Sequence, residues 1–219
     1  MRKLGDVEGC YSVGPDKFGF GVTMSLKNNK LLIGSLKEFV HLVEFKNGLT
    51  YGTNILGPEQ EDVSNTDRNR FGQSVHVGES NLFISDLGSS NGQGKVYVYP
   101  YLKTNNKTDE SPWTNYYTIQ PFDLIEKSYF GYRFSDSENQ LAISTFNQSD
   151  IYIFNKNEIN DRFVLSNVLS NSDYSSTDYF GRNVAMVNNA LVTDAYYAEE
   201  LILYDNISSN RQSFQNIST

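Results

Sequence analysis

The chain has 219 residues, with 18 basic and 26 acidic side chains, so its net charge is −8 at neutral pH. A surface of this sign repels a phosphate backbone, and no long run of Lys and Arg residues offsets it, which argues against nucleic-acid binding. Because Cys10 is the single cysteine, no disulfide can form within the chain.

Residues 1–14 precede the first repeated feature of the chain. They contain two basic residues with no apolar run behind them, which is not the pattern of a secretory signal. No stretch of the sequence approaches the length of an apolar membrane span, so membrane insertion is not expected. These features favour a cytoplasmic, virion-associated or assembly-associated location over secretion. The segment 7–14 is predicted to form an extra N-terminal strand.

Four Phe-Gly pairs recur along the chain at intervals of about 50 to 60 residues, which is the signature of a repeat fold. The pairs are Phe20-Gly21, Phe71-Gly72, Phe130-Gly131 and Phe180-Gly181. In the first three units a Leu and an Ile follow the Phe at fixed distances, namely Leu31 and Ile33, Leu82 and Ile84, and Leu141 and Ile143. The fourth unit is interpreted as one residue shorter, with Ala190 and Val192 in those places.

Each Phe-Gly pair opens a first apolar run, and three further runs follow it. The third runs lie at 39–45, 95–101, 150–156 and 200–206, and the weaker fourth runs at 49–55, 115–122, 162–168 and 211–217. Their alternation and short length predict strands rather than helices. Asn-Asn at 28–29 and 188–189 predicts tight two-residue hairpins between the first two strands, since Asn tolerates positive φ. The turns at 78–81 and 136–140 are predicted to be slightly longer.

Each unit is therefore predicted to be a four-stranded antiparallel meander, which has the size and content of one propeller blade. We expect an all-β fold, a β-propeller or propeller arc of four blades, in a single repeat domain spanning 1–219. The blades are expected at about 15–56, 66–121, 127–169 and 177–219. Within each blade, the Phe of the pair is expected to wedge between adjacent blades, while the Gly lets the innermost strand approach crowded backbone.

These units resemble the FG-GAP repeat, which is found in the propeller heads of integrin α subunits and in many microbial and viral repeat proteins. The resemblance is carried by FGQSV at 71–75, LFISD at 82–86 and GKVYVY at 94–99, and the same pattern surrounds Phe130, Phe180 and, more weakly, Phe20. It covers almost the whole chain. It implies a propeller but no particular activity, because propellers serve binding, catalysis and scaffolding.

Two departures from the FG-GAP pattern bear on function. The Gly-Ala-Pro of the family is not kept, and the acidic calcium loop between the first two strands is absent. Calcium needs six to eight oxygen ligands, and the richest candidate, Asp136-Ser137-Glu138, does not supply them. We therefore expect no metal site and no cofactor.

The number of units is a third departure, because the family usually has seven blades and this chain holds four. Two arrangements remain open: a small closed ring, or an arc whose open ends are covered by other protein chains. Exposed sheet edges favour pairing with other chains. The favoured arrangement is the arc, or a ring that is otherwise bound to protein, joined to other chains through residues 7–14 or through the edge of the last blade.

Candidate catalytic groups are few. His41 and His76 fall in predicted strands of different units without a shared motif, so both are interpreted as structural or solvent-facing. The glycine-rich segment 88–94 lacks the spacing and the following helix of a phosphate loop, and predicts a hairpin between two strands. Asp86 and Asp194 are taken to occupy equivalent places after the second strand, where loop solvation or turn capping is favoured over acid–base catalysis by paired carboxylates.

Aromatic residues in two segments are candidates for binding. Trp113, in the segment 112–117, and Tyr196 with Tyr197, in a predicted loop, could stack on a sugar or a partner protein. The favoured function is a non-enzymatic scaffold or interaction module within a larger protein assembly. The alternative is a lectin-like or adhesion module that uses these aromatics and Asp86 and Asp194 on one rim.

Overall fold

The computed structural model describes residues 23–35, 39–57, 70–101, 113, 115–170, 179–207 and 214–217. The predicted N-terminal strand at 7–14 and the first pair, Phe20-Gly21, lie outside these residues. Among the described residues, sixteen strands form four antiparallel sheets of four strands each, and every sheet is a simple meander in chain order. The all-β prediction with four four-stranded blades is therefore confirmed.

The four blades contain the following strands. Blade 1 comprises β1 (Met24–Lys27), β2 (Lys30–Ile33), β3 (Phe39–Lys46) and β4 (Leu49–Leu56). Blade 2 comprises β5 (Phe71–Val77), β6 (Asn81–Asp86), β7 (Lys95–Pro100) and β8 (Tyr117–Ile119). Blade 3 comprises β9 (Phe134–Asp136), β10 (Gln140–Ser144), β11 (Asp150–Lys156) and β12 (Phe163–Ser170). Blade 4 comprises β13 (Phe180–Val187), β14 (Ala190–Ala195), β15 (Glu200–Tyr204) and β16 (Phe214–Ile217).

Local sequence accounts for most of these boundaries. Asn28, Asn29 and Asn188 adopt positive φ values of 49°, 61° and 55°, as the two-residue hairpins require. The segment at 88–94 connects β6 to β7 and contains the short turn α1 (Ser89–Gly92), in which Ser90 and Asn91 have positive φ values of 53° and 58°. Strand β8 is shorter than the run predicted at 115–122, and it ends before Pro121, which cannot donate a ladder hydrogen bond.

The fourth unit is not one residue shorter than the others, which corrects the sequence interpretation. In blade 4 Phe180 lies opposite Ala195, and in blade 2 Phe71 lies opposite Asp86. These pairs have the same separation in the sequence, so Leu191 takes the place of Leu82. The misreading arose because a Thr, not an Ile, follows Leu191 at the position of the second apolar residue.

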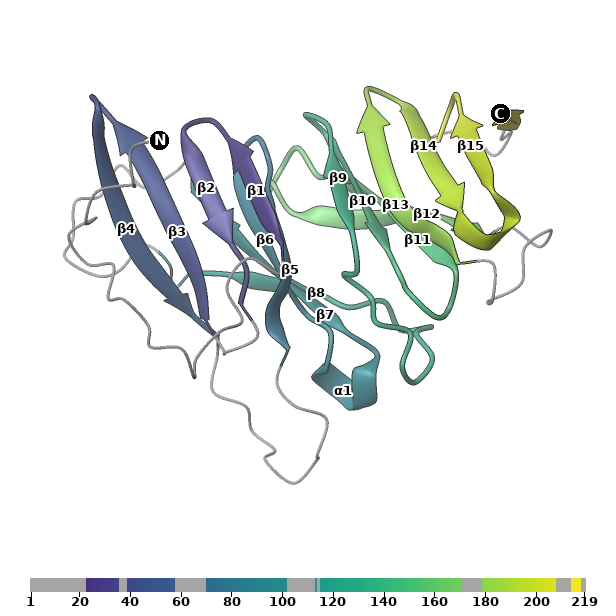
Figure 1. Cartoon of the computed structure of the whole chain (residues 1–219), viewed down its shortest axis with the longest axis horizontal. Helices are drawn as coiled ribbons and strands as arrows, with labels where there is room; N and C mark the ends of the chain where they lie inside the picture. The colour runs from purple at the N-terminus through teal and green to yellow at the C-terminus, as the bar shows by residue number, and fades with distance from the viewer. Residues whose placement is uncertain are drawn as a thin grey trace.

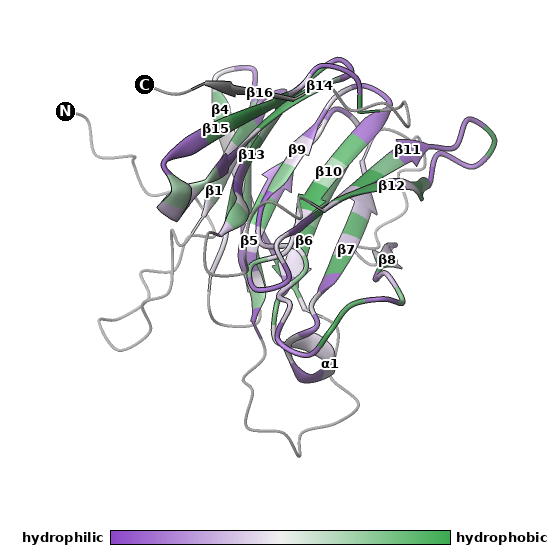
Figure 2. Ribbon diagram, turned by 90° about the vertical axis from the view of Figure 1, so that its right-hand side faces the viewer, coloured by the Kyte–Doolittle hydropathy of each residue, from purple (hydrophilic) through white to green (hydrophobic). Residues whose placement is uncertain are grey.

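The blades lie side by side in one row (Figure 1), with blade 1 and blade 4 at opposite ends. The described strands therefore form an arc. Viewed along the row (Figure 2), β10 is mostly hydrophobic, whereas the turn that joins β11 to β12 is mostly hydrophilic. Apolar residues thus concentrate in the strands, where blades face one another.

Within the described part of the chain, hydrophobic clusters fill each space between neighbouring blades. Phe71, Phe130 and Phe180 are all essentially inaccessible to solvent, and each belongs to the cluster between its own blade and the preceding one. Gly72 has a φ of +85°, and a Cβ atom built on it would lie 2.7 Å from Val40 Cγ2 in blade 1. The Phe-Gly pair therefore lies where one blade packs on the next.

Candidate functional site

The strand register reveals which side chains of each blade face the next blade along the arc. In blades 1 to 3 these side chains are apolar and at most 1% exposed. They are Leu32, Val40 and Leu42 in blade 1, Phe83, Val96 and Val98 in blade 2, and Ala142, Ile151 and Ile153 in blade 3. The same positions of blade 4 hold Val192, Leu201 and Leu203. Here Leu201 is 44% exposed, because no described blade covers it.

We call this outer surface the blade 4 end face, defined by Ala185, Val187, Val192, Leu201 and Leu203. Successive side chains of a strand point to opposite faces. Met186 of β13 is buried against blade 3, so its neighbours Ala185 and Val187 belong to the outer face. Val187 is among the most exposed large apolar side chains of the described residues. The end face therefore continues the apolar surface that blades 1 to 3 bury.

The opposite end of the arc shows the complementary surface. In blade 2, Val75, Val77, Leu82 and Ile84 face blade 1 and are at most 6% exposed. The equivalent residues of blade 1 are Met24, Leu26, Leu31 and Ile33, which we call the blade 1 end face. Met24 is 65% and Leu26 67% exposed, while His41 and Val43, deeper on the same side, are buried.

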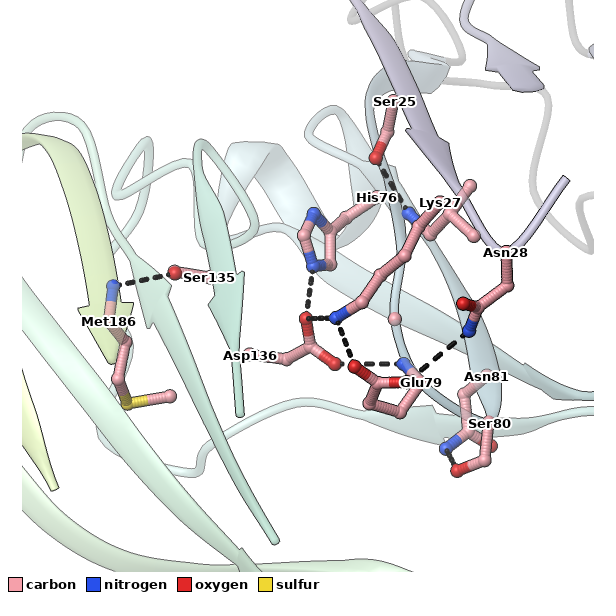
Figure 3. Close-up of polar contacts among 12 residues, drawn as sticks. Ser25, Lys27, Asn28, His76, Glu79, Ser80, Asn81, Ser135, Asp136 and Met186 are labelled. Carbon is pink, nitrogen blue, oxygen red and sulfur yellow. Dashed lines mark hydrogen bonds and ion pairs between the residues drawn. The ribbon is translucent and has the colours of Figure 1, made fainter. Parts of the chain in front are cut away.

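A polar link joins each pair of neighbouring blades at one repeat position, the fifth residue after the Phe. Ser25 Oγ accepts a hydrogen bond from the backbone N–H of Val77 at 2.9 Å, and Ser135 Oγ accepts one from the N–H of Met186 at 2.8 Å (Figure 3). Between blades 2 and 3 the position is His76, whose Nε2 lies 2.8 Å from Asp136 Oδ1. A polar side chain at this position thus contacts the next blade at every described junction.

Asp136 is the centre of a polar cluster that connects three blades (Figure 3). Its side chain is only 5% exposed, and besides His76 it contacts the Glu79 backbone N–H at 3.0 Å and Lys27 Nζ at 3.3 Å. Lys27 Nζ also lies 2.9 Å from Glu79 Oε1. Lys27 of blade 1 therefore reaches a carboxylate of blade 3 at the edge of blade 2.

The electrostatics of this cluster favour the ionised state of Asp136. Burial alone would raise the pKa of Asp136, but the hydrogen bond and charge of His76, the Glu79 N–H and the charge of Lys27 together lower it. Burial would likewise lower the pKa of Lys27, but Glu79 and Asp136 raise it. The Lys27 hydrogen bond lowers the pKa of Glu79. The cluster is a charge-paired clamp between innermost strands.

Aromatic rings form a second feature, a rim along the side of the arc where the Phe-Gly pairs lie. Tyr129 and Phe146 of blade 3 and Tyr179, Tyr197 and Tyr196 of blade 4 follow one another with ring centroids 6.4, 5.0, 5.2 and 5.1 Å apart. The rings come together because Tyr129 and Tyr179 each precede a Phe-Gly pair and so recur at one repeat position.

Arginine side chains cover this aromatic rim. Arg70 lies 5.2 Å from the Tyr129 ring, Arg133 lies 4.2 Å from Tyr132, and Arg182 lies 4.6 Å from Tyr196. Within the described residues, none of the three guanidinium groups forms an ion pair with a carboxylate. The rim is thus a local cationic and aromatic surface on an acidic protein.

The candidates from the sequence occupy different surroundings. Tyr196 and Tyr197 lie on a short 3₁₀ helix, η3 (Tyr196–Ala198), and are exposed on the rim. Trp113 is partly buried against the cluster between blades 1 and 2. The structure does not bring Trp113 into the ladder of rings that holds the two tyrosines.

Asp86 and Asp194 do not occupy equivalent places, which corrects the interpretation from sequence. Asp194 takes the repeat position of Ser85, and each accepts the backbone N–H of the residue opposite: Asn183 N to Asp194 Oδ1 at 2.8 Å, and Ser74 N to Ser85 Oγ at 2.9 Å. Asp86 Oδ1 instead accepts the N–H groups of Arg70 and Gly88. Both carboxylates therefore accept hydrogen bonds from backbone N–H groups.

The two histidines lie apart, as the sequence interpretation held. His41 Nδ1 contacts Asn54 Oδ1 within blade 1 at 2.7 Å, whereas His76 belongs to the Asp136 cluster. The Asp136 cluster itself was not predicted. A signal existed in the polar residues Ser25, His76 and Ser135, which stand at one repeat position. The described residues include no cluster of metal-binding side chains and no helix that is long and apolar enough to cross a membrane.

Comparisons with known proteins bear on the fold. No family model matches the chain, and no curated protein matches its sequence. The structure is similar to that of a streptogramin B lyase, with a TM-score of 0.57 and 11% identity over 95% of this chain and 57% of that one. It is also similar to the β-propeller domain of Cps50 (Swd1) from Myceliophteria thermophila, with a TM-score of 0.55 and 9% identity over 86% of this chain and 57% of that one.

A third similar structure is apo AztD from Citrobacter koseri, with a TM-score of 0.55 and 10% identity over 90% of this chain and 46% of that one. The chain spans about half the length of the solved chains it matches. At these identities the likeness concerns the fold alone. The described residues form a β-propeller fold of four four-stranded blades.

Proposed function

We propose that this chain is a non-enzymatic, FG-GAP-like propeller module that works through protein–protein contact as a component of a larger protein assembly. The observation that carries the proposal is the exposure of apolar side chains on both end faces, at positions that the inner blades bury. Contiguous apolar surface of this kind marks interaction sites in soluble proteins.

The energetic scale supports this role. Complete burial of one exposed Leu, Val or Met side chain stabilises a complex by about 1.5–3 kcal/mol. Several such side chains lie on each end face, among them Met24 and Leu26 at one end and Val187 and Leu201 at the other. Covering either face would therefore supply a useful part of the free energy of a stable association.

The polar groups of the described residues support a structural rather than a catalytic role. The His76–Asp136 contact resembles a general-base arrangement, but Lys27 and the Glu79 N–H also bind this carboxylate. Asp136 is mostly buried between blades, where a substrate would have to displace these partners. A contact of this kind holds blades together.

The test compares natural assemblies that contain variant chains. Leu26→Asp and Leu201→Asp each place a charge on one end face, and Ile159→Asp is the control because Ile159 is 95% exposed in the turn between β11 and β12. The molar mass of the native complex in extracts of cells that make the protein is measured by size-exclusion with light scattering. We expect both end-face variants to reduce this mass and Ile159→Asp to leave it unchanged. A mass that neither end-face variant alters would refute the proposal.

A second candidate function is favoured by the aromatic rim. Exposed tyrosine rings can stack on sugar rings, and stacked guanidinium groups still offer N–H donors to carboxylates. The geometry of Tyr196, Tyr197 and Arg182 therefore suits a glycan that carries carboxylate groups, in line with a lectin-like module.

This candidate is tested on a glycan array, with and without calcium. We expect the intact chain to bind acidic glycans, and Tyr197→Ala and Arg182→Ala to weaken binding at least tenfold, because each removes a stacking or charge contact. Tyr51→Ala is the control, since Tyr51 is also about half exposed but lies on β4 of blade 1. No binding to any acidic glycan would exclude the lectin function and leave the assembly function untouched.

A further inference from the structure

We propose that the protein that covers each end face is the end blade of a second copy of this chain, so that two copies join head to tail into one ring. This inference rests on the proposed function and names its partner. In such a joint the blade 4 end face of one copy packs on the blade 1 end face of the other.

The first argument is that the two end faces are the two halves of one contact. The chain makes this contact three times among the described blades, each time between the same repeat positions. The blade 4 end face has Leu201 and Leu203 where blade 2 has Val96 and Val98. Because the backbone geometry repeats, a blade 4 that meets a blade 1 presents surfaces already shaped for each other.

The polar link distinguishes the joint between copies from the inner junctions. At the described junctions the fifth residue after the Phe is Ser25, His76 or Ser135, and it contacts the sixth residue of the next blade. In blade 4 the fifth residue is Ala185, and in blade 1 the sixth is Leu26. A joint between copies therefore places Ala185 against Leu26, whose backbone N–H lacks the hydroxyl acceptor that Val77 and Met186 find at the inner junctions. The joint is therefore expected to be weaker than an inner junction by about one hydrogen bond.

The second argument is the geometry of the ring. The four blades cover 57% of one longer solved chain of similar fold and 46% of another, so their arrangement leaves room in a ring for several further blades. Two copies contribute eight blades, which is at the upper end of the range of about four to eight seen in propellers. Head-to-tail contacts that close in this way give a finite particle with two identical joints instead of a filament.

The experiment uses the purified chain and its two end-face variants in sedimentation and light-scattering measurements. We expect the unaltered chain to have twice the mass of one copy. Leu26→Asp and Leu201→Asp should each be monomeric, because each variant lacks one half of every joint. Ile159→Asp should remain a dimer.

Mixing provides the decisive measurement. Leu26→Asp keeps an intact blade 4 end face and Leu201→Asp keeps an intact blade 1 end face, so an equimolar mixture can form one intact joint. We expect a one-to-one dimer, which also shows that both variants are folded. It should dissociate about 10²- to 10⁴-fold more readily than the unaltered dimer, because the second joint no longer acts within the complex.

A further variant strengthens the joint instead of breaking it. Ala185→Ser restores the hydroxyl that Ser25 and Ser135 supply at the inner junctions. Because the ring has two joints and each gains one hydrogen bond, the dissociation constant of the dimer should fall by up to about a hundredfold. Unchanged affinity in this variant would contradict the repeat geometry of the joint.

Three results would overturn the inference: a monomeric unaltered chain, a dimer that survives both end-face variants, or a mixture of the two variants that stays monomeric. Each is distinguishable from failure of the proposed function. If the purified chain is monomeric but the native assembly still depends on Leu26 and Leu201, the partner is another protein. If the native assembly depends on neither residue, the proposed function itself fails.

Discussion

Gly72 offers a direct test of how the blades are joined. In the Gly72→Ala variant the new Cβ would lie 2.7 Å from Val40 Cγ2 and 3.1 Å from the Ser35 carbonyl oxygen, both in blade 1. The residue has a φ of +85°, where a side chain costs about 1–2 kcal/mol. Overpacking adds about 1–3 kcal/mol. Alanine also restricts the unfolded chain more than glycine does, which offsets this loss of stability by about 0.4–1 kcal/mol. We expect a net loss of about 3 kcal/mol in the free energy of unfolding.

The control separates backbone strain from crowding. Gly48 has a similar φ of +78°, but nothing lies within 4 Å of a Cβ built on it, so Gly48→Ala should lose only about 1 kcal/mol. Urea unfolding is followed by fluorescence of Trp113, the single tryptophan, which contacts the cluster between blades 1 and 2. The urea concentrations at the midpoint of unfolding are compared between variants whose unfolding free energy has the same dependence on urea concentration. Equal losses in the two variants would refute the view that crowding between blades restricts this position to glycine.

Three further predictions concern stability. Phe130→Ala should lose about 3–5 kcal/mol in urea unfolding because Phe130 is fully buried between blades 2 and 3, whereas exposed Phe122→Ala should lose almost nothing; similar losses would contradict the wedge role. The pKa of Asp136 is lowered in the folded protein, so its stabilising contribution is present above about pH 4 and is lost as the pH falls through the folded value. Asp136→Asn should therefore flatten the acid limb of a plot of unfolding free energy against pH, and an unchanged limb would exclude the charge-paired clamp. Burial raises the pKa of Tyr97 to about 12. The contribution of the neutral Tyr97 side chain to the free energy of unfolding is therefore complete below the ordinary tyrosine pKa of about 10 and is lost as the pH rises from about 10 to 12. Tyr97→Phe should reduce this alkaline loss of stability, as measured by circular dichroism.

Much of the fold could be predicted because its determinants are local. The period-two alternation of the runs and the Asn-Asn turns at 28–29 and 188–189 fix strands and hairpins within about fifty residues of chain. The recurrence of Phe-Gly gives the number of blades. The position of Phe130 in the cluster between two blades follows from the same repeat, because one wedge residue is needed at each junction.

The candidate site could be predicted only in part. Tyr196 and Tyr197 stand in a segment that reads as a loop, and the structure exposes them on the rim. The stacking of that rim on Tyr129 and Phe146 depends on how blades 3 and 4 pack. The fourth unit was misread by one residue, and a shift of one residue in a strand moves every side chain to the other face. That shift made Asp86 and Asp194 look equivalent.

The sequence by itself determined four antiparallel meanders and the wedge that separates them, because strand alternation, turn residues and repeat spacing act over short stretches of chain. Only the tertiary structure decided which blades meet. The contact of His76 with Asp136 joins residues sixty positions apart, and it depends on the packing of one sheet against another. The exposure of Met24 and Leu26 at one end, and of Leu201 at the other, also follows from that packing. These residues have the same local pattern as their buried equivalents and differ in that no blade among the described residues packs on them.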